Sequence, residues 1–135
     1  MRPVLIDSSF IYAFLNSSDQ HHAVAKSVFT ELTVQKQLIQ IPLPSLLESQ
    51  RLMLYRKPTD IPKSIRQIKR FSSEFQTLLP TKLELDAAEN TISLYLGVKL
   101  TLSDALIATM AYSNNARIAT FDQDFSILGC DVISV

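Results

Sequence analysis

Glycine is the scarcest structural residue of this 135-residue chain, which contains only Gly97 and Gly129. The P-loop and the G-x-G-x-x-G fingerprint each need several glycines close together, because the backbone must approach a phosphate group. Two isolated glycines therefore exclude nucleotide binding through either of these motifs.

Cysteine and histidine are almost as rare. A single cysteine, Cys130, excludes an internal disulfide and a zinc site built from several thiolates, and we expect it to be a small buried residue. The two histidines, His21 and His22, are adjacent, and we expect both to be exposed helix residues. No Ser-His-Asp or Cys-His arrangement is evident, so the sequence gives no support to a hydrolase that uses such a nucleophile.

Charged residues make up only 19% of the chain and hydrophobic residues 47%, which indicates a folded protein. The length predicts one domain over residues 1–135. The longest uncharged run, residues 105–116, is too short to span a bilayer, and the N-terminal apolar run ends at Asp7, too soon for a secretory signal. We therefore expect a cytoplasmic protein with no membrane partner.

The formal net charge is zero, from 13 basic and 13 acidic residues, and a balanced charge argues at first against a nucleic-acid partner. The charge is unevenly distributed, however. Residues 51–70 hold seven basic residues against one acid, a net +6, and the rest of the chain is −6. The seven are Arg51, Arg56, Lys57, Lys63, Arg66, Lys69 and Arg70. They are candidates for holding an RNA backbone, although a solvated face or a dimer interface would have the same pattern.

Short apolar runs alternate with segments of helical periodicity. The runs predict strands at residues 3–6, 38–41, 117–121 and 131–135, and possibly one near 78–80. The periodic segments predict helices at residues 10–15, 20–35, 44–56, 62–75, 84–96 and 101–114, and a short helical turn from residue 124. This alternation predicts an α/β fold with a mainly parallel sheet and helices on both faces.

Four acids occupy equivalent places in this pattern. Asp7 and Asp122 follow strands, and Glu48 and Asp104 lie in the first turns of later helices. Ligands of open parallel sheets bind at the carboxyl ends of the strands, so these acids should converge at one edge. Each has an ordinary alternative, as a helix cap, a turn residue or a solvated side chain. Asp124 is a less certain fifth member, since the N-cap of the short helix is the more ordinary role for it.

A cluster of carboxylates is self-repulsive and is best explained by a bound cation. Oxygen ligands without histidine favour Mg²⁺ or Mn²⁺, and such ions support displacement reactions at phosphorus. We therefore predict metal-binding and catalytic roles for Asp7, Glu48, Asp104 and Asp122. The hydroxyls of Ser9 and Thr120 are candidates for holding these carboxylates or a metal-bound water. Three aromatic residues near the site are more readily explained as core residues than as base-stacking residues: Tyr12, Tyr55 and Phe71.

Four segments around these acids resemble the PIN-domain nucleases, and among them the short VapC-like toxins. They are Val4-Leu-Ile-Asp7-Ser-Ser9, Pro44-Ser-Leu-Leu-Glu48, Leu102-Ser-Asp104-Ala-Leu-Ile-Ala-Thr-Met-Ala111 and Ala119-Thr-Phe-Asp122-Gln-Asp124-Phe. Their order and spacing match across nearly the whole chain, but nothing matches between residues 57 and 82. The resemblance implies a three-layer α/β/α fold and Mg²⁺- or Mn²⁺-dependent cleavage of RNA that leaves a 5′-phosphate and a 3′-hydroxyl. It also implies a homodimer and a small antitoxin partner. The basic segment at residues 51–70 could bind this antitoxin instead of RNA.

Other functions stay open at this point. The same nuclease fold could process RNA outside any toxin pair, or it could be a non-catalytic binding module, although the complete set of acids argues against the latter. A receiver-like signalling domain also gathers acids around Mg²⁺. It needs paired acids near the first strand and a lysine after a late strand, and this chain has neither feature.

Overall fold

The structure, a computed structural model, describes residues 2–56 and 61–133. Within these residues it contains four strands, in the spatial order β3-β2-β1-β4, and every neighbouring pair is parallel. The strands are β1 (Val4–Ile6), β2 (Ile39–Pro42), β3 (Gln76–Leu78) and β4 (Arg117–Ala119). The predicted parallel sheet is confirmed, and the uncertain strand near residues 78–80 lies slightly earlier, at β3.

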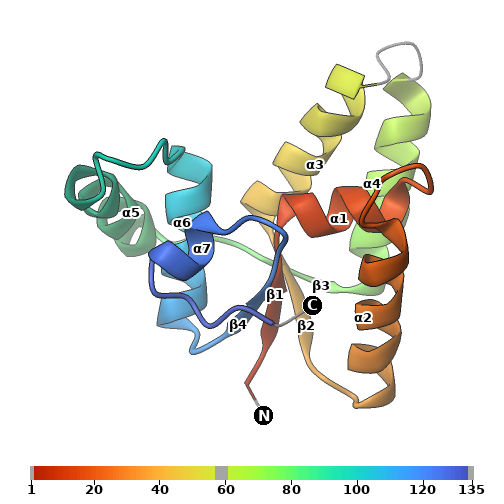
Figure 1. Ribbon diagram of the computed structural model, residues 1–135, viewed down its shortest axis with the longest axis horizontal. Coiled ribbons are helices and arrows are strands. Elements are labelled where there is room, and N and C mark those ends of the chain that lie inside the picture. The colour runs from red at the N-terminus through yellow and green to blue at the C-terminus, as the bar shows by residue number, and fades with distance from the viewer. Residues whose placement is uncertain (1, 57–60, 134–135) are drawn as a thin grey trace.

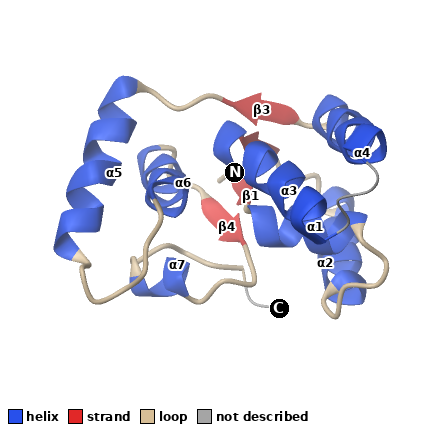
Figure 2. Ribbon diagram, turned by 90° about the horizontal axis from the view of Figure 1, so that it is seen from above, coloured by secondary structure: helices blue, strands red, loops and turns tan. Residues whose placement is uncertain are grey.

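Seven helices connect or flank these strands in the described residues, and Figure 1 shows them around the sheet. They are α1 (Ser8–Leu15), α2 (His22–Val34), α3 (Leu43–Arg56), α4 (Ile61–Glu74), α5 (Lys82–Leu94), α6 (Leu102–Ser113) and α7 (Asp124–Ile127). Seen from above in Figure 2, α1 to α4 lie to one side of the strands and α5 to α7 to the other. The three-layer α/β/α prediction is therefore confirmed.

The sheet separates two hydrophobic cores. Successive strand residues point to opposite faces, so Val4 and Ile6 of β1 enter the core beneath α1 to α4, whereas Leu5 enters the core beneath α5 to α7. All three side chains are fully buried. Because both faces are covered, β1 is a fully apolar run, whereas the flanking strands also contain polar residues such as Gln40 of β2.

The order of the strands defines the place of the functional edge. β1 lies between β2, which follows it in the chain, and β4, which comes last. The connections therefore leave β1 in opposite directions, and the carboxyl ends of β1 and β4 flank the switch point where open α/β sheets bind ligands. Asp7 immediately follows β1, and Asp122 comes three residues after β4 ends.

Two boundary predictions are wrong. The expected strand at residues 131–135 is reduced to an isolated bridge between Ile118 and Val132, and residues 134–135 lie outside the described residues. The helix expected at residues 84–96 ends two residues early, at Leu94 of α5, where the NH group of Tyr95 bonds to carbonyl oxygens of the last turn. Of the two glycines, only Gly129, just after α7, has a positive φ, the conformation that favours glycine.

Phenylalanine rings connect the helices of the first core. Phe29 of α2 is buried and contacts the rings of Phe10, Phe14, Phe71 and Phe75, with centroids 4.5 to 5.8 Å apart. These partners belong to α1, α4 and the residue before β3. One side chain therefore holds together three helices on this face of the sheet.

We predict that Phe29→Ala lowers the free energy of unfolding by about 3–5 kcal/mol, because it removes a buried ring and leaves a cavity. Val24→Ala on the same helix is the control, since Val24 is 40% exposed, and it should change stability by less than about 0.5 kcal/mol. Urea denaturation followed by circular dichroism measures both. Equal effects of the two substitutions would contradict the central place of Phe29 in this core.

Candidate active site

Asp7 is the buried centre of the acid cluster, with only 2% of its surface exposed. It occupies the N-cap position of α1, yet its side chain makes no capping hydrogen bond. Its Oδ2 instead accepts hydrogen bonds from the hydroxyls of Thr120, at 2.7 Å, and Ser9, at 3.0 Å, while Ser8 Oγ lies 3.4 Å from Oδ1. The carboxylate is therefore held by hydroxyl groups and left without a cationic partner among the described residues.

The loop after β4 is attached to the same hydroxyls. Ser9 Oγ accepts a hydrogen bond from the NH group of Phe121 at 3.1 Å, and Thr120 Oγ1 accepts one from the NH group of Asp122 at 3.0 Å. Asp122 Oδ1 in turn accepts a hydrogen bond from the NH group of Asp124 at 2.9 Å. Side chain and backbone thus form one continuous network that fixes the second acidic segment beside Asp7.

Asp124 differs from the other acids. It is the first residue of α7, and the N-cap of that helix is Gln123, so Asp124 is not the cap that the sequence suggested as an alternative. Its contact with the cluster is the hydrogen bond from its backbone NH group to Asp122. Its carboxylate makes no hydrogen bond or ion pair with the described part of the chain. It remains the weakest of the candidate ligands.

Glu48 and Asp104 approach the edge from two helices. Glu48 is one turn inside α3 and its side chain is 33% exposed, with Arg51 of the same helix 3.9 Å away. Asp104 lies in the first turn of α6, where its NH group donates to the Thr101 hydroxyl. Thr101 is therefore the N-cap of α6, and Asp104 lies at the start of the helix.

The electrostatics show that these acids share one environment. The pKa of Asp104 is raised to about 6, first by burial and then by the negative charges of Asp7, Asp122 and Glu48. Burial also raises the pKa of Asp7, against the hydrogen bonds from Thr120 and Ser9, and the charge of Asp122 adds to the increase. The structure thus brings together all four acids that the sequence singled out.

The donor set of this edge fits a hard divalent cation. All the groups are carboxylate or hydroxyl oxygens, and the acids are partly dehydrated and mutually repulsive, a state that a bound cation relieves. No three Asp, Glu, His or Cys side chains within residues 2–56 and 61–133 are arranged so that they could hold a metal ion as they stand. Binding would therefore require the half-buried carboxylates of the cluster to turn towards Asp7.

The basic residues of segment 51–70 divide into two groups. Arg51 and Arg56 lie on α3, and Arg56 is engaged away from the acid cluster, 3.8 Å from Asp19 and stacked over the Tyr12 ring. The others are exposed on α4, apart from Lys57, which lies outside the described residues: Lys63, Arg66, Lys69 and Arg70. The two helices pack against each other, and Arg51 lies beside the candidate acid Glu48.

The aromatic and histidine predictions are partly wrong. Tyr12 and Phe71 are buried core residues as expected, but Tyr55 is 86% exposed. Neither histidine is a freely exposed helix residue. His21 stacks on Phe121 and His22 Nδ1 lies 2.8 Å from the carbonyl oxygen of Ala13, so both are half-buried. The sequence gives no signal for the first contact, since the two rings are a hundred residues apart.

Two cavities are lined in part by α6, and one of them lies beside the acidic edge. A groove of about 460 Å³ runs beside Glu48, between α3 and the start of α6, and is lined mainly by leucine and proline side chains. The larger cavity, about 710 Å³, lies between α5, α6 and residues 128–131 and contains none of the candidate acids. Of these two cavities, the groove is therefore the one that adjoins the acid cluster.

The α/β fold and the four acids at the carboxyl edge of its sheet can now be compared with those of known proteins. The model of the PIN domain matches residues 4–129, so the chain belongs to the PIN-domain family. No curated protein matches its sequence. None of the helices within the described ranges is long and apolar enough to cross a membrane.

Solved structures of similar fold include toxins and toxin–antitoxin complexes. VapC20 of Mycobacterium tuberculosis, described as a toxin that cleaves the sarcin-ricin loop, is 21% identical with a TM-score of 0.78, over 94% of this chain and 95% of that one. DNA-bound VapBC of Salmonella typhimurium is 15% identical, with a TM-score of 0.75 over 98% of both chains. FitAcB of Neisseria gonorrhoeae is 14% identical, with a TM-score of 0.75 over 97% of this chain and 96% of that one.

We predict that the metal-free protein loses stability as the pH rises from about 4 to about 7. In this range the unfolded state has released the Asp104 proton, whose pKa is ordinarily 3.8, while the folded state retains it up to about 6. Because Asp104 is partly exposed, we expect the loss to be about 1 kcal/mol from this residue, less than the shift alone implies. Asp7, whose pKa is also raised, adds to it.

Asp104→Asn should remove part of this loss, whereas Glu74→Gln, which removes an exposed carboxylate at the end of α4, should not. Urea denaturation in EDTA at pH 4.5 and pH 7.5 measures the difference for each protein. An identical pH dependence in the wild type and Asp104→Asn would contradict the electrostatic account of the cluster.

Proposed function

We propose that this protein is a divalent-metal-dependent ribonuclease and the toxin of a toxin–antitoxin pair. The observation that carries the proposal is the convergence of Asp7, Glu48, Asp104 and Asp122 at the switch point of the sheet, where burial and then the charges of the other three raise the pKa of Asp104. Membership of the PIN-domain family supports the same conclusion.

In this proposal the four acids hold Mg²⁺ or Mn²⁺, with Asp124 as a further ligand of lesser weight. The cation, when bound, supplies a water nucleophile at neutral pH and neutralises charge on the phosphate. Asp7 is the fixed member, because Ser9 and Thr120 hold one of its oxygens. Glu48 and Asp104 are more exposed and adjust their orientation, and Asp122 is held near them by the Thr120 hydroxyl.

The toxin assignment draws on the proteins of similar fold. One of them is described as an RNA-loop-cleaving toxin and others as toxin–antitoxin complexes, and their chains match this one almost end to end. We therefore propose RNA as the substrate and a small antitoxin as a partner. The homodimer and the cytoplasmic location remain predictions of the sequence.

We predict that the purified protein cleaves single-stranded RNA with Mg²⁺ or Mn²⁺ and loses this activity in EDTA. Asp7→Asn and Asp104→Asn should each reduce cleavage at least about a hundredfold while the proteins stay folded, because each removes a negative charge that the cation requires. Gel analysis of a labelled RNA gives the rates, and Glu74→Gln is the matched control. Equal cleavage by the wild type and both Asn variants would show that the activity belongs to a contaminant.

The same variants separate a toxin from an RNA-processing enzyme. Expression of the wild type should arrest bacterial growth, and Asp104→Asn should not. Cleavage in vitro without growth arrest would support the processing role, and binding of RNA without cleavage in any metal would support a non-catalytic module.

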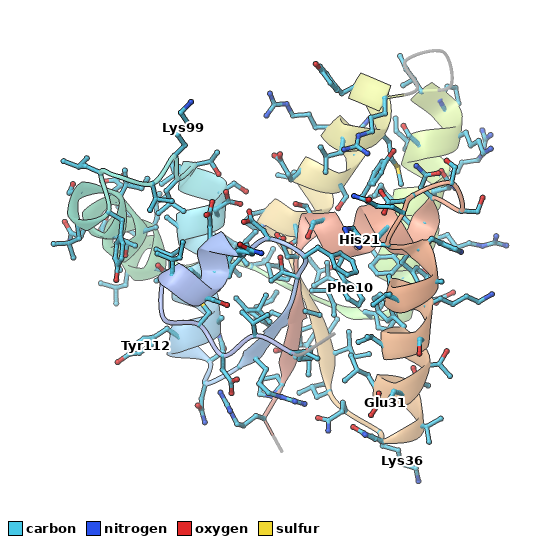
Figure 3. The ribbon with its side chains drawn as sticks, in the orientation of Figure 1. Phe10, His21, Glu31, Lys36, Lys99 and Tyr112 are labelled. Carbon is cyan, nitrogen blue, oxygen red and sulfur yellow. The ribbon has the colours of Figure 1, made fainter. Side chains whose placement is uncertain are left out.

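The basic face of α4 gives a further prediction, that it contacts the RNA backbone. In the Asp104→Asn background with EDTA, Arg66→Gln with Arg70→Gln should lower the slope of log affinity against log salt by about 1.4, from two lost phosphate contacts to single-stranded RNA. Lys26→Gln on α2 with Lys36→Gln just after that helix is the control pair, and Figure 3 shows Lys36 at the end of the molecule opposite the acidic edge. An unchanged slope in the α4 variant would assign this face to the partner copy or the antitoxin instead.

A further inference from the structure

Phe121 connects the acidic edge to the core, and its surroundings are unusual for a loop residue. It lies between Thr120 and Asp122, and its ring stacks on the buried ring of Phe10, with centroids 5.1 Å apart and an interplanar angle of 12°. The ring of His21 stacks on it as well, with centroids 4.3 Å apart and the same angle. The described residues contain no ring contact between Phe10 and His21, so the two cover opposite faces of Phe121.

The two outer rings of this stack are anchored independently of the loop. Phe10 belongs to α1, and His21 is the N-cap residue of α2, where its NH group donates to Asp19 Oδ1 at 2.8 Å. Asp19 also lies 3.8 Å from the guanidinium of Arg56. In Figure 3, Phe10 lies below His21, towards the sheet. The rings of Phe10 and His21 therefore form a clamp fixed to the helical layer, and Phe121 is held inside it.

What the clamp holds is the backbone that carries Asp122. The NH group of Phe121 donates to Ser9, the NH group of Asp122 donates to Thr120, and the NH group of Asp124 donates to Asp122. These are bonds of exposed or half-buried groups, and each contributes only about 0.5–1.5 kcal/mol. A stacked aromatic pair adds a comparable amount beyond its burial. Loss of one ring from the clamp would therefore weaken the attachment of the loop substantially.

The contact of His21 with Phe121 is made through the face of the ring. The imidazole of His21 makes no hydrogen bond or ion pair with the described part of the chain. The neighbouring His22 behaves differently, because its Nδ1 contacts the carbonyl oxygen of Ala13 and so joins α2 to α1. A planar ring, and not an imidazole nitrogen, is thus what the position of His21 supplies.

We infer that His21 is a positioning residue for the acid cluster: by clamping Phe121 against Phe10 it holds Asp122 in reach of the cation beside Asp7. The consequence for the cation rests on the proposed function, whereas the consequence for the loop does not. A direct contact between His21 and RNA is the competing explanation, and the experiment below separates the two.

The test compares His21→Ala and His21→Phe with Gln20→Ala, the matched control at the exposed neighbouring position. Hydrogen exchange of the amides of residues 121–124 is measured in the metal-free protein, at a temperature where circular dichroism shows each variant folded. We expect exchange about fivefold faster in His21→Ala. His21→Phe and Gln20→Ala should stay within about twofold of the wild type, since His21→Phe keeps a ring that can stack. If His21→Ala does not fold, His21→Gln, which keeps the bulk without a ring, takes its place with the same expectation.

Calorimetric titration with Mn²⁺ tests the consequence for the site without relying on cleavage. Affinity should fall about tenfold in His21→Ala and by less than about twofold in His21→Phe, in line with the usual effect of residues that orient metal ligands. If Phe121→Leu is already present, His21→Ala should have little additional effect, because the two residues act through one contact.

Unchanged exchange in His21→Ala would overturn the inference, and so would a His21→Phe protein as impaired as His21→Ala. Weaker RNA binding by His21→Ala in EDTA, with wild-type exchange and Mn²⁺ affinity, would establish the direct contact instead. A wild type that does not bind Mn²⁺ would refute the proposed function, and the exchange measurement alone would then decide the role of His21.

Discussion

The mutual repulsion of four carboxylates at one edge of the sheet is the constraint on which the site depends. Asp7 is buried, and Asp104 keeps its proton up to a pH of about 6, first because it is partly buried and then because of the negative charges of Asp7, Asp122 and Glu48. Nothing in the core requires this arrangement, and it costs stability at neutral pH. The fold maintains it through hydroxyl groups that hold Asp7 without neutralising it. Such a site is stabilised most by a cation from outside the chain.

Much of this fold could be predicted from the sequence because the parallel sheet is covered on both faces. Short apolar runs such as Val4–Ile6 are then interpreted as buried strands, and the helices between them are predicted from their periodicity. The place of Asp7, Glu48, Asp104 and Asp122 followed from topology alone, since parallel strands bring their carboxyl ends together. The prediction of a last strand at residues 131–135 was wrong because only Val132 pairs with Ile118. Residue patterns do not indicate how many residues of a segment pair with a neighbouring strand.

What the sequence could not predict is the contacts between segments far apart in the chain. The stack of His21 on Phe121 joins the start of α2 to the loop after β4, and no local pattern announces it. The same holds for Arg56. In the sequence it belongs to the basic segment, but its guanidinium pairs with Asp19 and stacks over the Tyr12 ring. Composition gave the sum of charges correctly, while their pairing depended on tertiary structure.

The position of β4 has a consequence for the order of synthesis. β4 pairs with β1, so the first strand to be synthesised can form this pairing only when the last strand has been synthesised. The Thr120 hydroxyl can likewise bond to Asp7 only after 113 further residues have been added. Asp104 and Asp122 also belong to the final third of the chain. A nascent chain that has released α1 to α4 from the ribosome therefore holds only half of the acid cluster. Under the proposed function, the protein would therefore gain its ribonuclease activity only when its synthesis was nearly complete.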